Sequence, residues 1–125
     1  MLTYAQKKYL FAIYRLGKDG GAISSSDVSR IVGVSKASTV KMTQRLSDEG
    51  YIQKAPYGKI ALTDSGIKEA SSLFTSSLIL CDFLTNKVGI PEQEADSDAV
   101  KIVAQVSENT VEKLVKYALG DAVNA

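Results

Sequence analysis

The sequence lacks several residue types that many enzymes and metal sites depend on. It contains no histidine and no tryptophan, and only one cysteine and two prolines among its 125 residues. No Gly-rich phosphate loop is present, and no serine or cysteine has a base that the sequence reveals. We therefore expect that the protein is not an enzyme and has no catalytic residues. Cys81 cannot form an internal disulfide and lies in an apolar helical run, so we expect it to pack as a small hydrophobic residue.

Long apolar runs are also missing. No stretch approaches the roughly 18 to 20 apolar residues that cross a bilayer. The first residues, MLTYAQKKYLF, lack the apolar core and cleavage site of a signal peptide. We therefore expect a cytoplasmic protein with no membrane contact. The hydrophobic fraction of 45% and the charged fraction of 23% are ordinary for a globular chain.

Charge is distributed unevenly along the chain. Residues 1–63 carry ten basic and four acidic side chains, a net charge of +6, whereas residues 64–125 carry five basic and ten acidic side chains, a net charge of −5. A basic half joined to an acidic half is typical of a nucleic-acid module attached to a unit that does not touch phosphate. The charge pattern predicts a nucleic-acid partner for the first half, and the helix-turn-helix described next makes double-stranded DNA the expected one.

The first half has the element order of a winged helix. Capping patterns at Thr3 and Ser24 start two helices, and Ser35 caps a third that runs to about Glu49. The second of these places Val28, Ile31 and Val32 on one apolar face. Strands are expected at 51–54 and 59–62, with a turn between them. Two helices joined by a tight turn and followed by a β-hairpin predict a winged helix-turn-helix, and the alternative to the short hairpin is an irregular loop.

The second half is expected to be helical throughout. One apolar stripe of the fourth helix comprises Ile67, Ala70, Phe74, Leu78, Cys81, Leu84 and Val88, and another comprises Leu73, Leu80 and Phe83. Two stripes need two partners, and we expect one to be the winged helix and the other a second subunit. The predicted homodimer interface consists of Leu73, Leu80, Phe83, Val111, Leu114 and Val115. The expected fold is thus mainly α, with a DNA-binding domain at 1–63 and a helical dimerisation domain at 64–125.

The candidate DNA-binding residues lie on the outward face of the third helix. Thr39, Thr43 (or Met42) and Leu46 lie at core spacing, which leaves Lys36, Ala37, Ser38, Val40, Lys41 and Arg45 turned outward. The basic side chains suit phosphate or guanine, and Val40 suits a thymine methyl group, although isolated exposed apolar residues are common.

Five further candidates lie outside that face. Ser25, Ser26 and Ser35 stand at helix starts, where they suit phosphate, although helix capping alone accounts for serine there. In the hairpin, Tyr57 and Lys59 flank Gly58 and suit the DNA backbone or minor groove, and a solvated hairpin is the alternative.

The segments together resemble the diphtheria toxin repressor and manganese transport regulator family of metal-dependent repressors. The matching stretches are YLFAIYRL, SSSDVSRIVGVSKASTVKMTQRLSDEGYI, YGKIALTDSGIKEA, FLTNKVGIPE and VSENTVEKLVKY, within residues 3–119. The first two are general to winged helices, whereas the others are more particular to this family. The resemblance implies a bacterial homodimeric repressor in which iron or manganese locks the dimer for operator binding.

The resemblance fails at the metal ligands. The family's ligand positions fall on Lys8, Phe11, Ser77, Cys81, Asp96, Val100, Val103 and Ala104. Cys81 and Asp96 alone are strong donors, too few for a transition metal, so we expect no metal and no other cofactor. One hypothesis is that the Lys8 ammonium replaces the ion by pairing with Asp96 or Asp82; the alternative is that Lys8 points to solvent.

The function that follows is a sequence-specific transcriptional regulator whose DNA binding requires no transition metal. The alternative is a winged-helix adaptor that binds proteins instead of DNA. The basic excess of the first half favours DNA, because a protein-binding surface would more often carry a clustered apolar patch. No small-molecule substrate is indicated.

Overall fold

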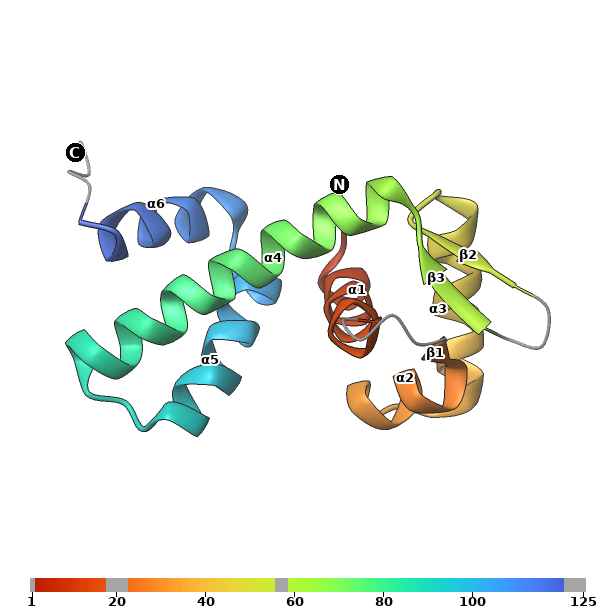
Figure 1. The fold of residues 1–125 in the computed structure, drawn as a ribbon, viewed down its shortest axis with the longest axis horizontal. Helices are drawn as coiled ribbons and strands as arrows, with labels where there is room; N and C mark the ends of the chain where they lie inside the picture. Colours follow the sequence, from red (N-terminus) through yellow and green to blue (C-terminus); the bar gives the residue numbers. More distant parts are fainter. Residues whose placement is uncertain (1, 18–22, 56–58, 121–125) are drawn as a thin grey trace. The chain divides into compact units, whose positions relative to one another are not determined.

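The computed structural model describes residues 2–17, 23–55 and 59–120, and the chain divides into two compact units, residues 1–71 and 72–125. Most of the predicted hairpin turn, residues 56–58, lies outside the described residues. Each unit is described by itself. In both units together the expected fold class is confirmed: a mainly helical chain with a winged helix-turn-helix and one small antiparallel sheet (Figure 1).

The first unit contains the winged helix. Its elements are α1 (Tyr4–Leu16), β1 (Ile23–Ser24), α2 (Ser25–Val32), α3 (Lys36–Asp48), β2 (Ile52–Lys54), β3 (Lys59–Leu62) and the start of α4 (Asp64–Phe83). The capping residues set these bounds: Thr3 forms a capping box with Gln6, and the side chains of Ser24 and Ser35 each accept a hydrogen bond from the backbone three residues later. Gly33 ends α2 in the left-handed conformation that the tight turn needs.

The sheet holds one strand more than the sequence predicted. Its order is β1-β3-β2, and both pairs are antiparallel. The hairpin pairs Ile52 with Leu62, and β1 pairs Ile23 with Ile60 on the other edge of β3. A strand of two residues has no alternation to detect, which explains why sequence patterning missed it.

The core of the first unit joins α1, α2, α3, the sheet and the start of α4. It consists of Tyr9, Leu10, Ile13, Ile23, Val28, Leu46, Ile52, Ile60 and Ala70. The prediction that Ile31 shares the buried face with Val28 is wrong, because Ile31 is 54% exposed whereas Val28 is fully buried. Three residues along a helix is a rotation of about 300°, so a narrow contact face includes one residue and leaves the other outside.

The second unit is helical in all its described elements. It contains the rest of α4, the π-helical turn η3 (Leu84–Val88), α5 (Glu92–Gln105) and α6 (Glu108–Ala118). Leu80, Ala99, Val103 and Val111 form its core, with Cys81 packed at the margin as a free thiol. Leu78, expected on an apolar stripe, is half exposed. No helix in the described ranges is both long and apolar enough to cross a membrane.

Candidate nucleic-acid interface

The two helices of the helix-turn-helix are joined by buried hydroxyl groups. The Ser29 and Thr39 hydroxyl oxygens form a buried hydrogen bond of 2.7 Å, and Ser29 also donates to the Ser25 carbonyl at 3.0 Å. The Thr43 hydroxyl donates to the Thr39 carbonyl at 2.8 Å, so Thr39 and Thr43 are both fully buried with their polar atoms bonded. Small side chains at the crossing let α2 and α3 approach closely, and the hydrogen bonds fix the rotation of α3 about its axis.

That rotation turns one face of α3 to solvent. Lys36, Ala37, Ser38, Val40, Lys41 and Arg45 are all exposed, and the opposite face, Thr39, Thr43 and Leu46, has no exposed surface. Lys36 and Lys41 form no ion pair with any residue that the structure describes. Val40 is 53% exposed between these cations. The structure thus brings the predicted α3 residues together on one surface, with two ammonium groups available to an anionic partner.

Arg45 differs from the two lysines because its guanidinium is held. Its Nε donates to Glu49 Oε2 at 2.9 Å, and the same oxygen accepts a hydrogen bond of 2.9 Å from Nε2 of Gln6. These hydrogen bonds, the one from Gln6 first and then the one from Arg45, hold the pKa of the Glu49 carboxyl below its ordinary value. Sequence patterning did not identify Gln6 and Glu49 as residues of this interface, because their contact joins residues 43 positions apart.

The predicted serines lie at helix starts, where the Ser35 hydroxyl already forms hydrogen bonds. Ser35 caps α3 by accepting from the Ser38 backbone at 3.1 Å, and its hydroxyl donates to Ser38 Oγ at 3.0 Å. Ser25 is half-buried and its carbonyl accepts from Ser29, whereas Ser26 is exposed. The Ser38 hydroxyl therefore keeps its hydrogen for another acceptor at the open N-terminus of α3.

The β-hairpin carries two further exposed cations, Lys54 and Lys59. Lys59 is exposed in β3, where its carbonyl accepts a backbone hydrogen bond of 2.8 Å from Ala55, and Tyr57 lies outside the described residues. Lys54 of β2, which the sequence reasoning did not single out, donates to Gln44 Oε1 of α3 at a long 3.5 Å. Lys54 shares the side of β2 with the buried Ile52, so strand alternation gave no outward signal for it.

The positions that correspond to the resembled family's metal ligands do not form a ligand set. The Lys8 ammonium lies 5.5 Å from the Tyr4 ring centroid on its own helix, and Phe11 is buried beneath the Arg15 guanidinium. In the second unit the buried Ser77 hydroxyl donates to the Phe74 carbonyl at 2.7 Å. Val100, Val103 and Ala104 offer only hydrocarbon, and Cys81 and Asp96 are half-buried. Within the described residues no three His, Cys, Asp or Glu side chains converge on a common point, so the donors do not fit a transition metal.

The residues predicted for a dimer interface fall into two groups. Leu80 and Val111 are 3% and 9% exposed within the core of the single chain, so a partner subunit has almost no surface of theirs to contact. Leu73, Phe83 and Val115 are half-buried, and Leu114 is exposed. The expectation thus fails for Leu80 and Val111 because they hold α4, α5 and α6 of one unit together.

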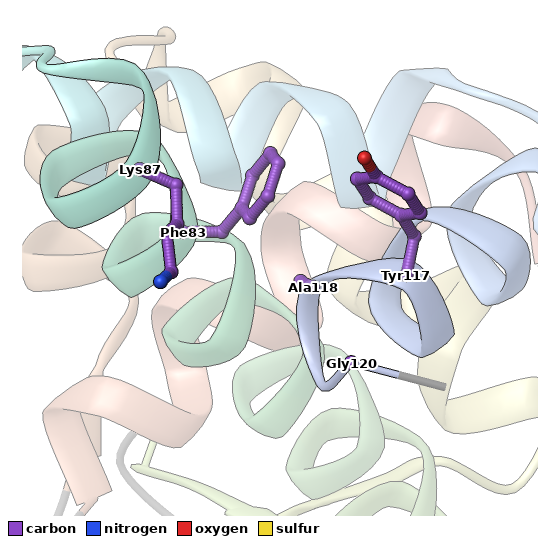
Figure 2. A pocket seen from close by; sticks show the side chains of 5 residues that line it. All are labelled: Phe83, Lys87, Tyr117, Ala118 and Gly120. Atoms are coloured by element: carbon purple, nitrogen blue, oxygen red, sulfur yellow. The ribbon is translucent and has the colours of Figure 1, made fainter. Parts of the chain in front are cut away.

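Phe83 lines a surface hollow. The hollow has a volume of about 470 Å³ and is lined by Phe83, Lys87, Tyr117, Ala118 and Gly120 (Figure 2). The Phe83 and Tyr117 rings meet edge to face, with centroids 5.9 Å apart and an interplanar angle of 79°. This contact joins the end of α4 to the last turn of α6, so Phe83 already packs against a neighbour within its own unit.

Comparison with known proteins agrees with this architecture. Residues 1–60 match the model of the iron dependent repressor N-terminal DNA binding domain, and residues 63–119 match its metal binding and dimerisation domain. An uncharacterised helix-turn-helix transcriptional regulator of Methanocaldococcus jannaschii is 25% identical over 89% of this chain and 86% of its own length. The transcriptional regulator MntR of Lysinibacillus sphaericus is 27% identical over 91% of this chain and 81% of its own.

Solved structures show the same fold. The IdeR protein of T. acidophilum aligns with 91% of this chain at a TM-score of 0.76 and 25% identity, and the manganese regulator SloR aligns with 94% at a TM-score of 0.75 and 26% identity. This chain spans only 53% and 54% of those two chains. The resemblance inferred from the sequence is therefore confirmed: the chain belongs to the iron-dependent repressor family, a family of DNA-binding transcriptional regulators and not of enzymes.

Proposed function

We propose that the protein is a dimeric, sequence-specific transcriptional repressor that binds double-stranded DNA without a transition metal. The observation that carries this proposal is the exposed basic face of α3, with Lys36 and Lys41 unpaired among the described residues. A convex helical face of this kind fits a major groove, and unpaired ammonium groups there replace counterions on phosphates. The two domains have the roles that the sequence suggested: residues 1–63 bind DNA, and residues 64–125 form the dimer.

The residues of the face have different roles. Lys36 and Lys41 bind phosphate or guanine, and Ser38 and the backbone at the start of α3 donate to a phosphate. Val40 contacts a thymine methyl, because a half-exposed branched side chain between cations offers a base edge an apolar contact. Lys59 of the wing contacts the backbone of the same half-site, and Lys54, whose ammonium lies against Gln44 of α3, adds a second cation.

Metal independence rests on the chemistry of the ligand positions. Val103 and Ala104 are buried hydrocarbon, and the Ser77 hydroxyl is bonded within its own helix. Binding a divalent ion there would require removing its water shell against apolar side chains. The free-energy cost of that desolvation is far larger than the binding free energy that two scattered donors supply. The protein thus keeps the fold of the family without the family's metal-binding site.

The dimer surface that we propose uses the exposed apolar residues of the second unit. Leu78 is 50% exposed, Tyr117 61% and Leu119 60%, and Leu114 lies on the same helix as Tyr117. Apolar side chains gathered in one small unit favour contact with a second copy over solvent. Phe83 adjoins this set through its contact with Tyr117, and Leu73 is half-buried on α4, whereas Leu80 and Val111 stabilise the unit itself.

The salt dependence of DNA binding tests the assignment. The double variant Lys36→Ala/Lys41→Ala removes two phosphate-binding charges, so the slope of log K against log salt should flatten by about 1.8 per chain and about 3.6 per dimer. The matched control is Lys101→Ala/Lys113→Ala, which removes the same charge from exposed positions of the second unit. Equal slopes for the two double variants would contradict the assigned face.

Selection of DNA from a random library tests sequence specificity and metal independence together. The selection is run once with a chelator and once with added manganese or iron. We expect the same pseudo-palindromic duplex and the same affinity in both conditions. Selection only in the presence of metal would show that the degenerate ligand positions still bind an ion.

A further inference from the structure

Arg45 is connected to the interior of the protein by a chain of hydrogen bonds. The Thr3 backbone N–H donates to Gln6 Oε1 at 2.9 Å, Gln6 Nε2 donates to Glu49 Oε2 at 2.9 Å, and Arg45 Nε donates to that oxygen at 2.9 Å. Gln6 has no exposed surface. Both ends of its amide are bonded, so the amide cannot rotate without breaking a buried contact. Glu49 is therefore anchored, although its own side chain is 41% exposed.

An exposed ion pair between residues i and i+4 contributes little by itself. Two other exposed pairs of the first unit show the contrast: Arg30 bonds Asp27, and Gln44 bonds Asp48, and neither acid accepts a hydrogen bond from a buried side chain of the described residues. Glu49 alone among these described acids accepts from a fully buried donor. The anchor suggests that the orientation of Arg45 matters more than the energy of the pair.

The geometry also determines which edge of Arg45 remains available. Glu49 occupies Nε, so the two Nη groups are left for another acceptor. Arg45 lies in the last turn of α3 and is 54% exposed, beyond the N-terminal residues that enter the groove most deeply. A guanidinium with free Nη groups at the edge of a groove matches the oxygens of a phosphate.

We propose that Glu49, anchored by the buried Gln6, is a positioning residue that fixes the Arg45 guanidinium for contact with a DNA phosphate. This inference rests on the proposed function, since it concerns the same DNA-binding face. It also explains why an acid stands where it would otherwise repel the nucleic acid. A carboxylate beside a phosphate weakens binding unless it orients a cation that contacts that phosphate.

The sign of one substitution tests the proposal. Electrostatics alone predicts that Glu49→Ala strengthens DNA binding, because it removes a negative charge. Positioning predicts the opposite: affinity for the selected duplex falls about 2- to 10-fold per half-site, because the freed Arg45 side chain must be ordered on binding. The matched control is Asp48→Ala, which removes a neighbouring exposed acid bonded to Gln44 and not to Arg45, and it should leave affinity unchanged or raise it.

A double-mutant cycle separates positioning from a structural role. If Glu49 acts through Arg45, Glu49→Ala causes no further loss in an Arg45→Ala background, whereas general damage to the fold would weaken binding in both backgrounds. Gln6→Met, checked for folding by circular dichroism, should give a smaller loss with the same dependence on Arg45. NMR relaxation of the arginine Nε–H groups gives a readout without DNA: the Arg45 group should be ordered in the unaltered protein and mobile in Glu49→Ala, with Arg30 as the internal reference.

Each outcome has one interpretation. Equal or tighter binding by Glu49→Ala than by Asp48→Ala, while the unaltered protein binds its duplex, overturns the positioning role alone. Failure of the unaltered protein to bind DNA overturns both this inference and the proposed function. An Arg45 Nε–H group that is as mobile in the unaltered protein as in Glu49→Ala also overturns the positioning role.

Discussion

Gly66 is the position where the structure and helix propensity predict opposite results. Gly66 is buried in the first turn of α4, and its N–H donates to the Thr63 hydroxyl at 3.1 Å. A Cβ at this position would lie 3.0 Å from the Tyr51 carbonyl carbon, closer still to its oxygen, and 3.1 Å from Leu62 Cδ2. The Tyr51 oxygen cannot yield freely, because it accepts the Thr63 N–H at 3.0 Å.

The magnitude for Gly66→Ala follows from three terms. Overpacking against backbone costs about 1–3 kcal/mol, and weakening the Thr63 to Tyr51 hydrogen bond costs about 0.5–1.5 kcal/mol. The better helix propensity of alanine offsets about 1 kcal/mol. We expect the free energy of unfolding to fall by about 0.5–3.5 kcal/mol, whereas propensity alone predicts a gain of about 1 kcal/mol.

Urea unfolding followed by far-UV circular dichroism measures the change in the free energy of unfolding, since the chain has no tryptophan for fluorescence. Ser65→Ala is the control, because Ser65 is the exposed neighbour in the same turn and should change stability by no more than about 0.5 kcal/mol. Gly66→Ala that is as stable as the unaltered protein, or more so, would refute the close approach of α4 to the Tyr51 backbone.

Two other predictions concern the hydrogen bonds that hold α3. Ser29→Ala and Thr39→Val should each lower the free energy of unfolding by about 0.5–1.5 kcal/mol. The double variant should lose less than the sum of the two, because each substitution removes the same hydrogen bond. Additive losses in urea unfolding would contradict that shared bond. The lowered pKa of Glu49 means that its ionised form stabilises the fold above the ordinary value of 4.5 and that this contribution is lost as pH falls through the lowered pKa. The stability difference between the unaltered protein and Glu49→Gln should therefore stay constant from about pH 8 to about pH 5 and shrink below 4.5, and a difference that already shrinks near neutral pH would argue against the anchored carboxylate.

The elements that capping residues and strong periodicity define could be predicted from the sequence. Ser35 begins α3, the strand at 59–62 has the predicted bounds, and Thr39 and Leu46 lie on the buried side as their spacing indicated. These features depend on interactions within a few residues, which a single sequence contains. The outward position of the α3 cations follows from the same periodicity.

Features that depend on distant residues could not be predicted. The burial of Leu80 is determined by where α5 and α6 pack, and the exposure of Ile31 by the narrow contact of α2 with its neighbours. The contact of Gln6 with Glu49 requires knowing that the start of α1 lies beside the end of α3. A polar contact of this kind needs only one residue on each element, so it produces no periodic pattern in the sequence.

The hydroxyl contact between Ser29 and Thr39 also bears on how such proteins diversify. Because α3 is fixed from its inner side, by Thr39, Thr43 and Leu46, its outer positions carry no share of that attachment. Under the DNA-binding role proposed for α3, mutations at Lys36, Ala37 or Val40 would thus change the preferred base sequence while the helix keeps its place. Descendants of one ancestral gene can acquire new genomic targets by single substitutions, without first repairing the stability of the molecule.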